Sequence, residues 1–136
     1  MATTLLGPIA RFSVIAITLA ALALATMAIA RATYWSGYPS YNGCTTFASA
    51  NADAEIWGDD ASSYHDDYLG CATNVATKIQ AYYDGSWHDT GWDIAPAIAF
   101  AYDSDDDIHQ ARGNNQIETG TGNWSGFFYS SFVVPS

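Results

Sequence analysis

The chain contains nineteen consecutive residues without a charged side chain, from Phe12 to Ala30, and they are bounded by Arg11 and Arg31. As an α-helix this segment would be about 28 Å long, close to the thickness of the hydrocarbon layer of a membrane. The segment therefore predicts that residues 1–32 are a hydrophobic N-terminal segment addressed to a membrane, and that residues 33–136 form a separate domain.

Two interpretations of residues 1–32 remain open. In the first they are a secretory signal peptide, and Ala30-Arg31-Ala32 is a small-x-small cleavage site that leaves Thr33 as the new N-terminus. In the second, residues 12–30 are retained as a helix that anchors the chain in a membrane or packs into an assembly, where its many alanines let another helix approach closely. Both interpretations predict an extracytoplasmic domain, either secreted or held at the cell surface.

Residues 33–136 are strongly acidic. They hold all fourteen Asp and Glu side chains of the chain and only two basic side chains, Lys78 and Arg112, so their formal charge is 2 − 14 = −12. Such a domain repels phosphate backbones and anionic lipid surfaces, which argues against nucleic acid as a partner.

The chain has two cysteines, Cys44 and Cys71. In an oxidising compartment a pair of this kind is expected to form one disulfide. A bridge over this span would stabilise the fold by about 3–4 kcal/mol, because it restricts the unfolded chain.

The clearest strand signal is the alternation of residues 75–83, in which the apolar and β-branched side chains fall on one face and Lys78 and Gln80 on the other. Asp84-Gly85 follows and predicts a type I′ turn, because both central residues of that turn need positive φ angles. We expect Ser86–Trp92 to be the returning strand, with Trp87 and Trp92 on opposite faces.

Further strands are expected at Ala97–Tyr102 and at Gly126–Val134. A second hairpin is expected around Gly113-Asn114-Asn115, and Asp103–Asp107 reads as a turn. Together these segments predict an all-β fold, a small antiparallel β-sandwich or barrel-like domain preceded by one N-terminal hydrophobic helix.

The first part of the domain is harder to interpret. Residues 33–43 are rich in turn formers and aromatics, and they read as a linker or an irregular edge segment. Ala48–Trp57 fits either a short helix or a strand around Ala54–Trp57, and Ser62–Gly70 reads as a loop.

Asp103, Asp105 and Asp107 have the alternating spacing of oxygen ligands in many calcium loops. The sequence departs from an EF-hand loop, because Ile108 stands where that loop has Gly, and Asn114 stands where it has a bidentate Glu. An acidic, solvated turn between strands is the alternative interpretation, and no other cofactor is indicated.

Nineteen aromatic side chains lie in residues 33–136. Trp35, Tyr38 and Tyr41 lie outside any clear strand pattern, and one tryptophan of the pair Trp87 and Trp92 is expected to be exposed. Exposed aromatic rings beside Asp and Asn suit carbohydrate rings, and they suit protein interfaces equally well. The alternative is that most of these side chains form the core.

The three histidines, His65, His88 and His109, each have an aspartate within two residues. A metal or acid–base site would require them to converge. No helical His-x-x-x-His pair, nucleophile motif or phosphate-binding glycine loop is present, so the sequence gives no positive indication of an enzyme.

The order of parts, an apolar N-terminal helix before a β domain, resembles archaeal-type pilins and related filament subunits. That resemblance implies self-assembly through the helix, but it covers architecture alone and carries no functional residue. The sequence also departs from the group, because no basic leader with a processing site precedes Phe12.

The sequence thus predicts a non-enzymatic extracytoplasmic β domain that acts as a structural or binding component at the cell surface. Two more specific alternatives stay open. One is a helix-anchored subunit of a filament, coat or membrane complex, in contact with the membrane through residues 12–30. The other is a secreted module that binds carbohydrate or protein.

Overall fold

The computed structural model describes residues 33–136, so the predicted hydrophobic helix and cleavage site in residues 1–32 lie outside the described residues. The described residues form an all-β domain with antiparallel strand pairing, as predicted. No helix that is both long enough and apolar enough to cross a membrane occurs among residues 33–136.

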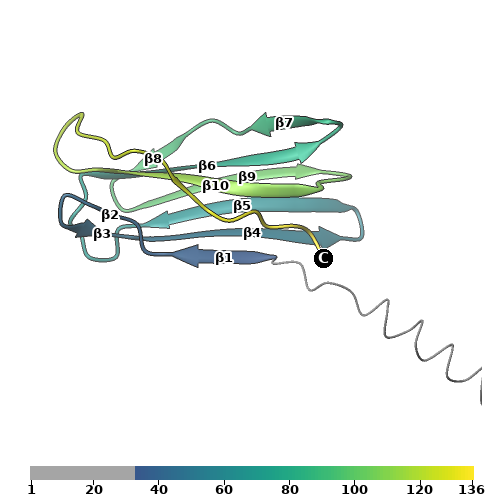
Figure 1. The fold of residues 1–136 in the computed structure, drawn as a ribbon, viewed down its shortest axis with the longest axis horizontal. Helices are drawn as coiled ribbons and strands as arrows, with labels where there is room; N and C mark the ends of the chain where they lie inside the picture. Colours follow the sequence, from purple (N-terminus) through teal and green to yellow (C-terminus); the bar gives the residue numbers. More distant parts are fainter. Residues whose placement is uncertain (1–32) are drawn as a thin grey trace, which may run out of the picture. The chain divides into compact units, whose positions relative to one another are not determined.

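Two antiparallel sheets face each other in a β-sandwich-like arrangement (Figure 1). The first sheet has the order β1-β4-β5-β9 and contains β1 (Tyr34–Gly37), β4 (Phe47–Glu55), β5 (Gly58–Asp66) and β9 (Ile98–Asp105). The second has the order β11-β10-β6-β7, with β8 also paired to β6, and contains β6 (Asn74–Tyr83), β7 (Ser86–Asp89), β8 (Asp93–Ala95), β10 (Gln110–Glu118) and β11 (Phe128–Tyr129). A small separate hairpin joins β2 (Ser40–Tyr41) to β3 (Cys44–Thr45).

The predicted turn at Asp84-Gly85 is confirmed. Tyr83 pairs with Ser86, and the two residues between them have φ angles of 50° and 72°. The returning strand β7 ends at Asp89 rather than at Trp92, because the chain turns at Thr90-Gly91, where Gly91 has a φ of 79°.

The expectations for residues 33–70 are largely wrong. Residues 34–37 form a regular edge strand, and Ala48–Trp57 is neither a helix nor a strand confined to its last residues, since β4 begins at Phe47. The expected loop at Ser62–Gly70 is the second half of β5 followed by a turn. Most inward positions of β4 and β5 are occupied by alanine or serine, which hide the apolar alternation that normally reveals a strand.

The expected hairpin at Gly113-Asn114-Asn115 is also wrong. These residues lie in the middle of β10 and pair with residues 77–79 of β6. The last expected strand, Gly126–Val134, is reduced to β11 and one isolated bridge between Val133 and Ala111. At the end of β9 the strand continues through Asp105, so only the last residues of Asp103–Asp107 form a turn.

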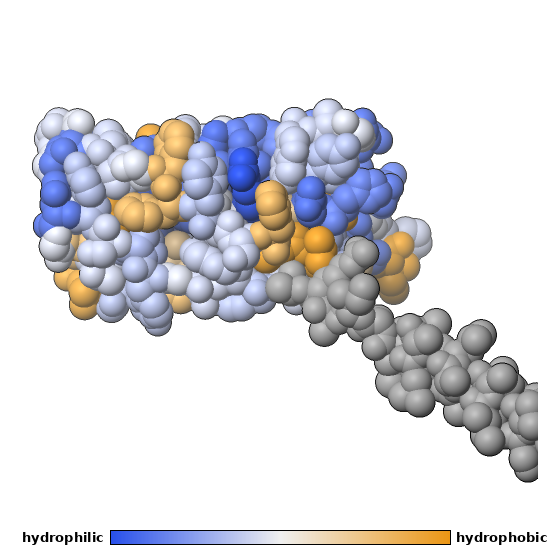
Figure 2. Space-filling model, viewed as in Figure 1, coloured by the Kyte–Doolittle hydropathy of each residue, from blue (hydrophilic) through white to orange (hydrophobic). Residues whose placement is uncertain are grey.

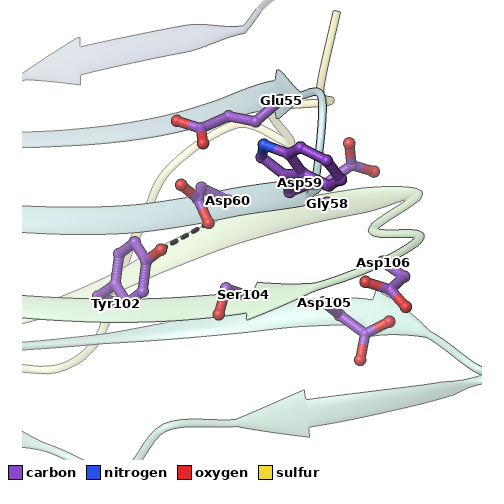
Figure 3. A pocket seen from close by; sticks show the side chains of 9 residues that line it. Glu55, Gly58, Asp59, Asp60, Tyr102, Ser104, Asp105 and Asp106 are labelled. Carbon is purple, nitrogen blue, oxygen red and sulfur yellow. Dashed lines mark hydrogen bonds between the residues drawn. The ribbon is translucent and has the colours of Figure 1, made fainter.

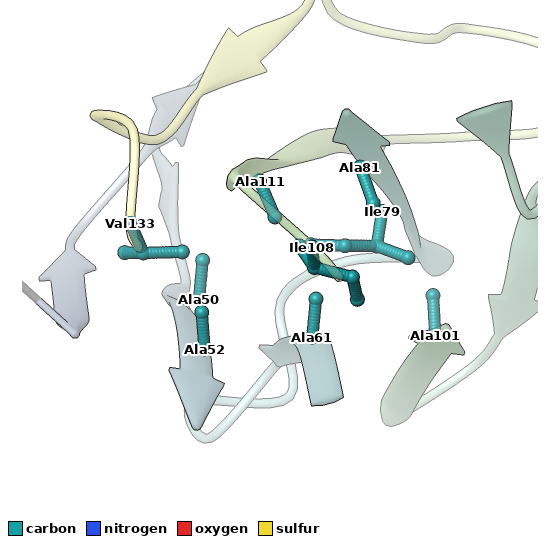
Figure 4. Packing of buried hydrophobic residues seen from close by; sticks show 9 residues of the cluster. All are labelled: Ala50, Ala52, Ala61, Ile79, Ala81, Ala101, Ile108, Ala111 and Val133. Atoms are coloured by element: carbon teal, nitrogen blue, oxygen red, sulfur yellow. The ribbon is translucent and has the colours of Figure 1, made fainter. Parts of the chain in front are cut away.

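The core between the sheets is built mainly of alanine (Figure 4). Its larger members are Ile79, Ile108 and Val133, and its alanines come from both sheets: Ala50, Ala52, Ala61, Ala81, Ala101 and Ala111. Val133 enters this cluster from the C-terminal segment. Because an alanine interior fills little space, the two sheets can approach closely only where side chains stay small.

Polar side chains continue the interface between the sheets. Ser63 of the first sheet hydrogen-bonds Thr77 of the second, with 2.6 Å between the hydroxyl oxygens, and the Thr77 hydroxyl lies 2.9 Å from the Asn115 side-chain oxygen. His65 is fully buried beside them. Its Nδ1–H donates to the Ala76 carbonyl at 3.0 Å, so its Nε2 accepts from the Thr46 hydroxyl at 2.7 Å.

Acid is expected to destabilise the domain through His65. Burial lowers the pKa of His65, and the hydrogen bond to Ala76 and the charges of Asp66 and Asp67 oppose this only in part. The unfolded state, with a pKa of about 6.5, takes up the proton first, so stability is fully present above that pH and falls below it by up to about 1.4 kcal/mol per pH unit.

Thermal unfolding of the wild type, His65→Gln and His109→Gln between pH 7.5 and pH 5 measures this effect. The midpoint of the wild type and of His109→Gln should fall with pH, whereas the midpoint of His65→Gln should change less. Equal slopes for all three proteins would contradict the assignment.

Candidate binding surfaces

The outer face of the second sheet carries a continuous group of aromatic rings. Strand alternation turns Lys78, Gln80 and Tyr82 of β6 outward, and Trp87 of β7 pairs directly with Tyr82. The C-terminal segment adds further rings next to β10. We call this surface the aromatic face; its members are Lys78, Tyr82, Trp87, Trp92, Arg112, Phe127, Tyr129 and Phe132.

Arg112 lies at the centre of the aromatic face. Its guanidinium carbon is 4.7 Å from the ring centre of Tyr129, 5.5 Å from that of Phe132 and 5.7 Å from that of Trp87. Its Nε donates to the Gln80 side-chain oxygen at 3.0 Å, and within residues 33–136 it has no ion-pair partner. The guanidinium charge is therefore held by aromatic rings and stays available to a carboxylate from another molecule.

Lys78 lies on the same face, 5.0 Å from the ring centre of Trp92. It forms an ion pair with Asp89. Partial burial raises the pKa of Asp89, but hydrogen bonds from Lys78, Gly91 and Gln80 outweigh this, so the pKa lies below its usual value. The aromatic face thus contains both basic residues of a domain with fourteen carboxylates.

Two hollows border this surface. One, of about 350 Å³, is lined by Ala76, Trp92, Ile94, Gln116, Trp124 and Phe127. The other, of about 500 Å³, is lined by Trp35, Tyr38, Pro39, Phe127, Phe128 and Tyr129. On β10, Asn114 pairs across the strands with Lys78 and Tyr129, and its side-chain oxygen is the one buried side-chain polar atom in the described residues without a hydrogen-bond partner.

A second exposed apolar feature is the tip of the β4–β5 hairpin. Glu55 pairs with Gly58, so the turn consists of Ile56 and Trp57, which are 91% and 89% exposed. Figure 3 shows the hollow beside this tip, which has a volume of about 390 Å³ and an acidic lining. Its carboxylates belong to Glu55, Asp59, Asp60, Asp105 and Asp106.

The three aspartates proposed for calcium have different surroundings. Burial raises the pKa of the Tyr83 hydroxyl, and the charge of the nearby Asp103 raises it further. Asp105 lines the acidic hollow and accepts a hydrogen bond from the Asp107 backbone, while the Asp107 carboxylate lies 3.6 Å from His109. Calcium at Asp103, Asp105 and Asp107 stays a prediction.

Within residues 33–136, one group of three potential metal ligands converges to within 4.8 Å, namely Cys44, Asp67 and Cys71. The predicted disulfide accounts for two of them, because Cys44 and Cys71 are bonded, with 5.4 Å between their Cα atoms. Asp67 accepts hydrogen bonds from the backbone amides of Cys71 and Ala72 at 3.0 and 2.8 Å. This group is therefore a structural disulfide with a hydrogen-bonded carboxylate beside it rather than a metal site.

The five aromatic residues predicted for binding do not form a single site. Trp87 and Trp92 lie on the same face, not on opposite faces, because the strand alternation stops at Asp89. Trp35 packs partly against the core, and Tyr38 forms an aromatic group with Phe47 and Tyr68. Both Trp35 and Tyr38 line the larger hollow beside the aromatic face rather than the face itself. Tyr41 donates a hydrogen bond to Asn123 at 2.9 Å.

The alternative in which most aromatics form the core is wrong, since no aromatic side chain of residues 33–136 is fully buried. Apolar side chains, coloured orange, come to the surface at several places in Figure 2. Phe127, Tyr129, Phe132 and Arg112 were not predicted as binding residues. Nothing in their spacing showed that the C-terminal segment lies along β10.

The three histidines do not converge. His65 is buried between the sheets, whereas His88 stacks on Tyr83 with 3.8 Å between the ring centres. His109 lies near Tyr82 and Asp107. The catalytic and metal sites that would require all three are therefore excluded.

The chain was also compared with known proteins. No protein family, no curated protein and no solved structure matches it.

Proposed function

We propose that this chain is a non-enzymatic structural component outside the cytoplasm that associates with copies of itself. The observation that carries the proposal is the reversal of the usual distribution of side chains. Alanine makes up most of the interior, and the aromatic side chains and several other large apolar ones are exposed on the outer faces and at a hairpin tip. Monomeric soluble proteins rarely expose contiguous apolar surface of this kind unless another molecule covers it.

The disulfide fits a location in an oxidising compartment. The apolar residues 12–30 would either deliver the domain there as a signal peptide or hold it at the membrane. If they are retained, the chain becomes a helix-anchored subunit of a filament, coat or membrane complex. If they are removed, the β domain acts at the cell surface or in the medium.

The particle size of the full-length chain, produced in an oxidising compartment, tests the proposal. Sedimentation velocity should reveal oligomers that dissociate on dilution. Association should strengthen with salt, because the charge of −12 on each domain opposes it and is screened. Mass spectrometry of the same sample identifies the mature N-terminus. A monomer at every concentration and salt level would end the proposal.

Carbohydrate binding is a second candidate, favoured by the hollow with tryptophan walls. Trp92, Trp124 and Phe127 offer apolar faces for a sugar ring, and Gln116 offers an amide. The same experiment separates the two functions. A monomer whose tryptophan emission shifts when oligosaccharides are added would favour this module over the structural component.

A further inference from the structure

The tip of the β4–β5 hairpin lacks the polar residues that are usual in a turn. Two-residue hairpin turns usually contain Asn, Asp or Gly, which suit solvent. The positive φ of this turn, 142°, falls on Gly58, so the departure concerns polarity and not backbone conformation. Here the turn consists of Ile56 and Trp57, the two most exposed large apolar residues among those described. Positions where the sequence opposes a local rule are often functional ones.

Carboxylates surround this apolar tip. Glu55 directly precedes it and Asp59 lies two residues after Trp57, and five of the nine residues that line the hollow beside the tip are acidic (Figure 3). We call these carboxylates, from Glu55, Asp59, Asp60, Asp105 and Asp106, the collar. The collar repels phosphate headgroups, so an anionic lipid surface is a poor partner for the tip. A matching partner must combine apolar surface with positive charge.

The aromatic face supplies that combination, and within residues 33–136 no other surface has basic side chains. It offers exposed rings, an adjoining hollow of about 350 Å³ and the charges of Lys78 and Arg112. The Arg112 charge lacks a carboxylate partner within the described residues. The tip has exposed apolar groups and carboxylates without ion-pair partners in the described part of the chain. The two surfaces therefore complement each other in charge and in apolar character.

We propose that the Ile56-Trp57 tip of one copy docks on the aromatic face of a second copy, with carboxylates of the collar opposite Arg112. This inference rests on the proposed self-association and specifies its contact. The contact is heterologous, because it joins two different surfaces. Every pair therefore keeps one free tip and one free face, and the assembly grows into a ring or a filament.

Photo-crosslinking tests the contact directly. Trp57 is replaced by the photoreactive aromatic p-benzoylphenylalanine, and this chain is mixed with an isotopically heavy wild-type chain. Illumination should crosslink position 57 to heavy peptides that contain residues 87–92 or 127–132. The same replacement at Tyr68, which is exposed elsewhere in the domain, is the control. Crosslinks from position 57 to other regions only, or none from an assembled sample, would overturn the inference.

Variants at both surfaces give an independent measurement. Trp57→Ser should weaken association at least about 30-fold, the loss typical of a truncated interface tryptophan, while Trp57→Phe should retain most of it. Trp57→Ser alters the tip but leaves the aromatic face intact, and Arg112→Glu alters the aromatic face but leaves the tip intact. Each variant alone should therefore lose association through this contact, and their mixture should restore the contact in pairs that do not extend further.

Thermal midpoints show whether both variants are folded. All variants carry the same residues 1–32, so association through that segment is common to them. If the wild type associates and Trp57→Ser associates equally well, this contact is wrong and the proposed function stands. If the wild type does not associate, both the proposed contact and the proposed function are wrong.

Discussion

Replacing Gly113 with alanine should lower the free energy of unfolding by about 1–3 kcal/mol, the usual cost of overpacking a filled core. A Cβ atom at this position would lie 2.4 Å from the Ser63 hydroxyl oxygen, 3.2 Å from the Ser63 Cβ and 3.5 Å from the Ala50 Cβ. These neighbours belong to the opposite sheet, so either the Ser63 hydroxyl must rotate and give up its hydrogen bond to Thr77, or the sheets must move apart. Urea unfolding measures the change.

Gly126→Ala is the matched control, because its added Cβ would meet nothing within 4 Å and its φ is not in the left-handed region. It should leave the midpoint nearly unchanged. Ser63→Ala combined with Gly113→Ala should recover part of the loss, because it removes the nearest atom. A Gly113→Ala protein as stable as the wild type would show that the sheets are not in close contact there.

Removing the Cys44–Cys71 disulfide should cost about 3–4 kcal/mol, which is a large part of the stability of a domain this size. The bridge closes a loop of 27 residues between β3 and the turn after β5, and this loop contains both β4 and β5. Without the bridge, the unfolded segment that contains these two strands is less restricted, so the folded sheet is less stable relative to it.

The comparison uses the oxidised wild type, the reduced wild type and Cys44→Ala combined with Cys71→Ser. Alanine suits the buried position 44, and serine suits the exposed position 71. Both bridge-free forms should unfold at a similar, clearly lower denaturant concentration. Unchanged midpoints would mean that the natural protein lacks the bridge.

Local chemistry predicted some parts of this fold. Strand β6 alternates in the ordinary way, and Asp84-Gly85 specifies its turn without help from the rest of the chain. The disulfide followed from the number of cysteines. The strand and its turn depend on residues that are close in sequence. The disulfide depends on two cysteines that have no alternative partner in the chain.

Other parts depend on packing between the sheets. Strands β4 and β5 point Ala48, Ala50, Ala52 and Ala61 inward, and alanine has no clear preference for a strand. Gly113 reads as a turn residue, although its real role is to let Ser63 approach. The aromatic face joins β6 and β7 to the C-terminal segment, and only tertiary structure brings Arg112 next to Tyr129 and Phe132.

The alanine-rich interior has an evolutionary consequence. Since most of the aromatic side chains lie at the surface, they can be exchanged without altering what holds the two layers together. Distant relatives should therefore preserve the every-second-residue pattern of alanine, serine and glycine while their tryptophans and tyrosines diverge. That pattern is the signature by which descendants of the same ancestor should be sought.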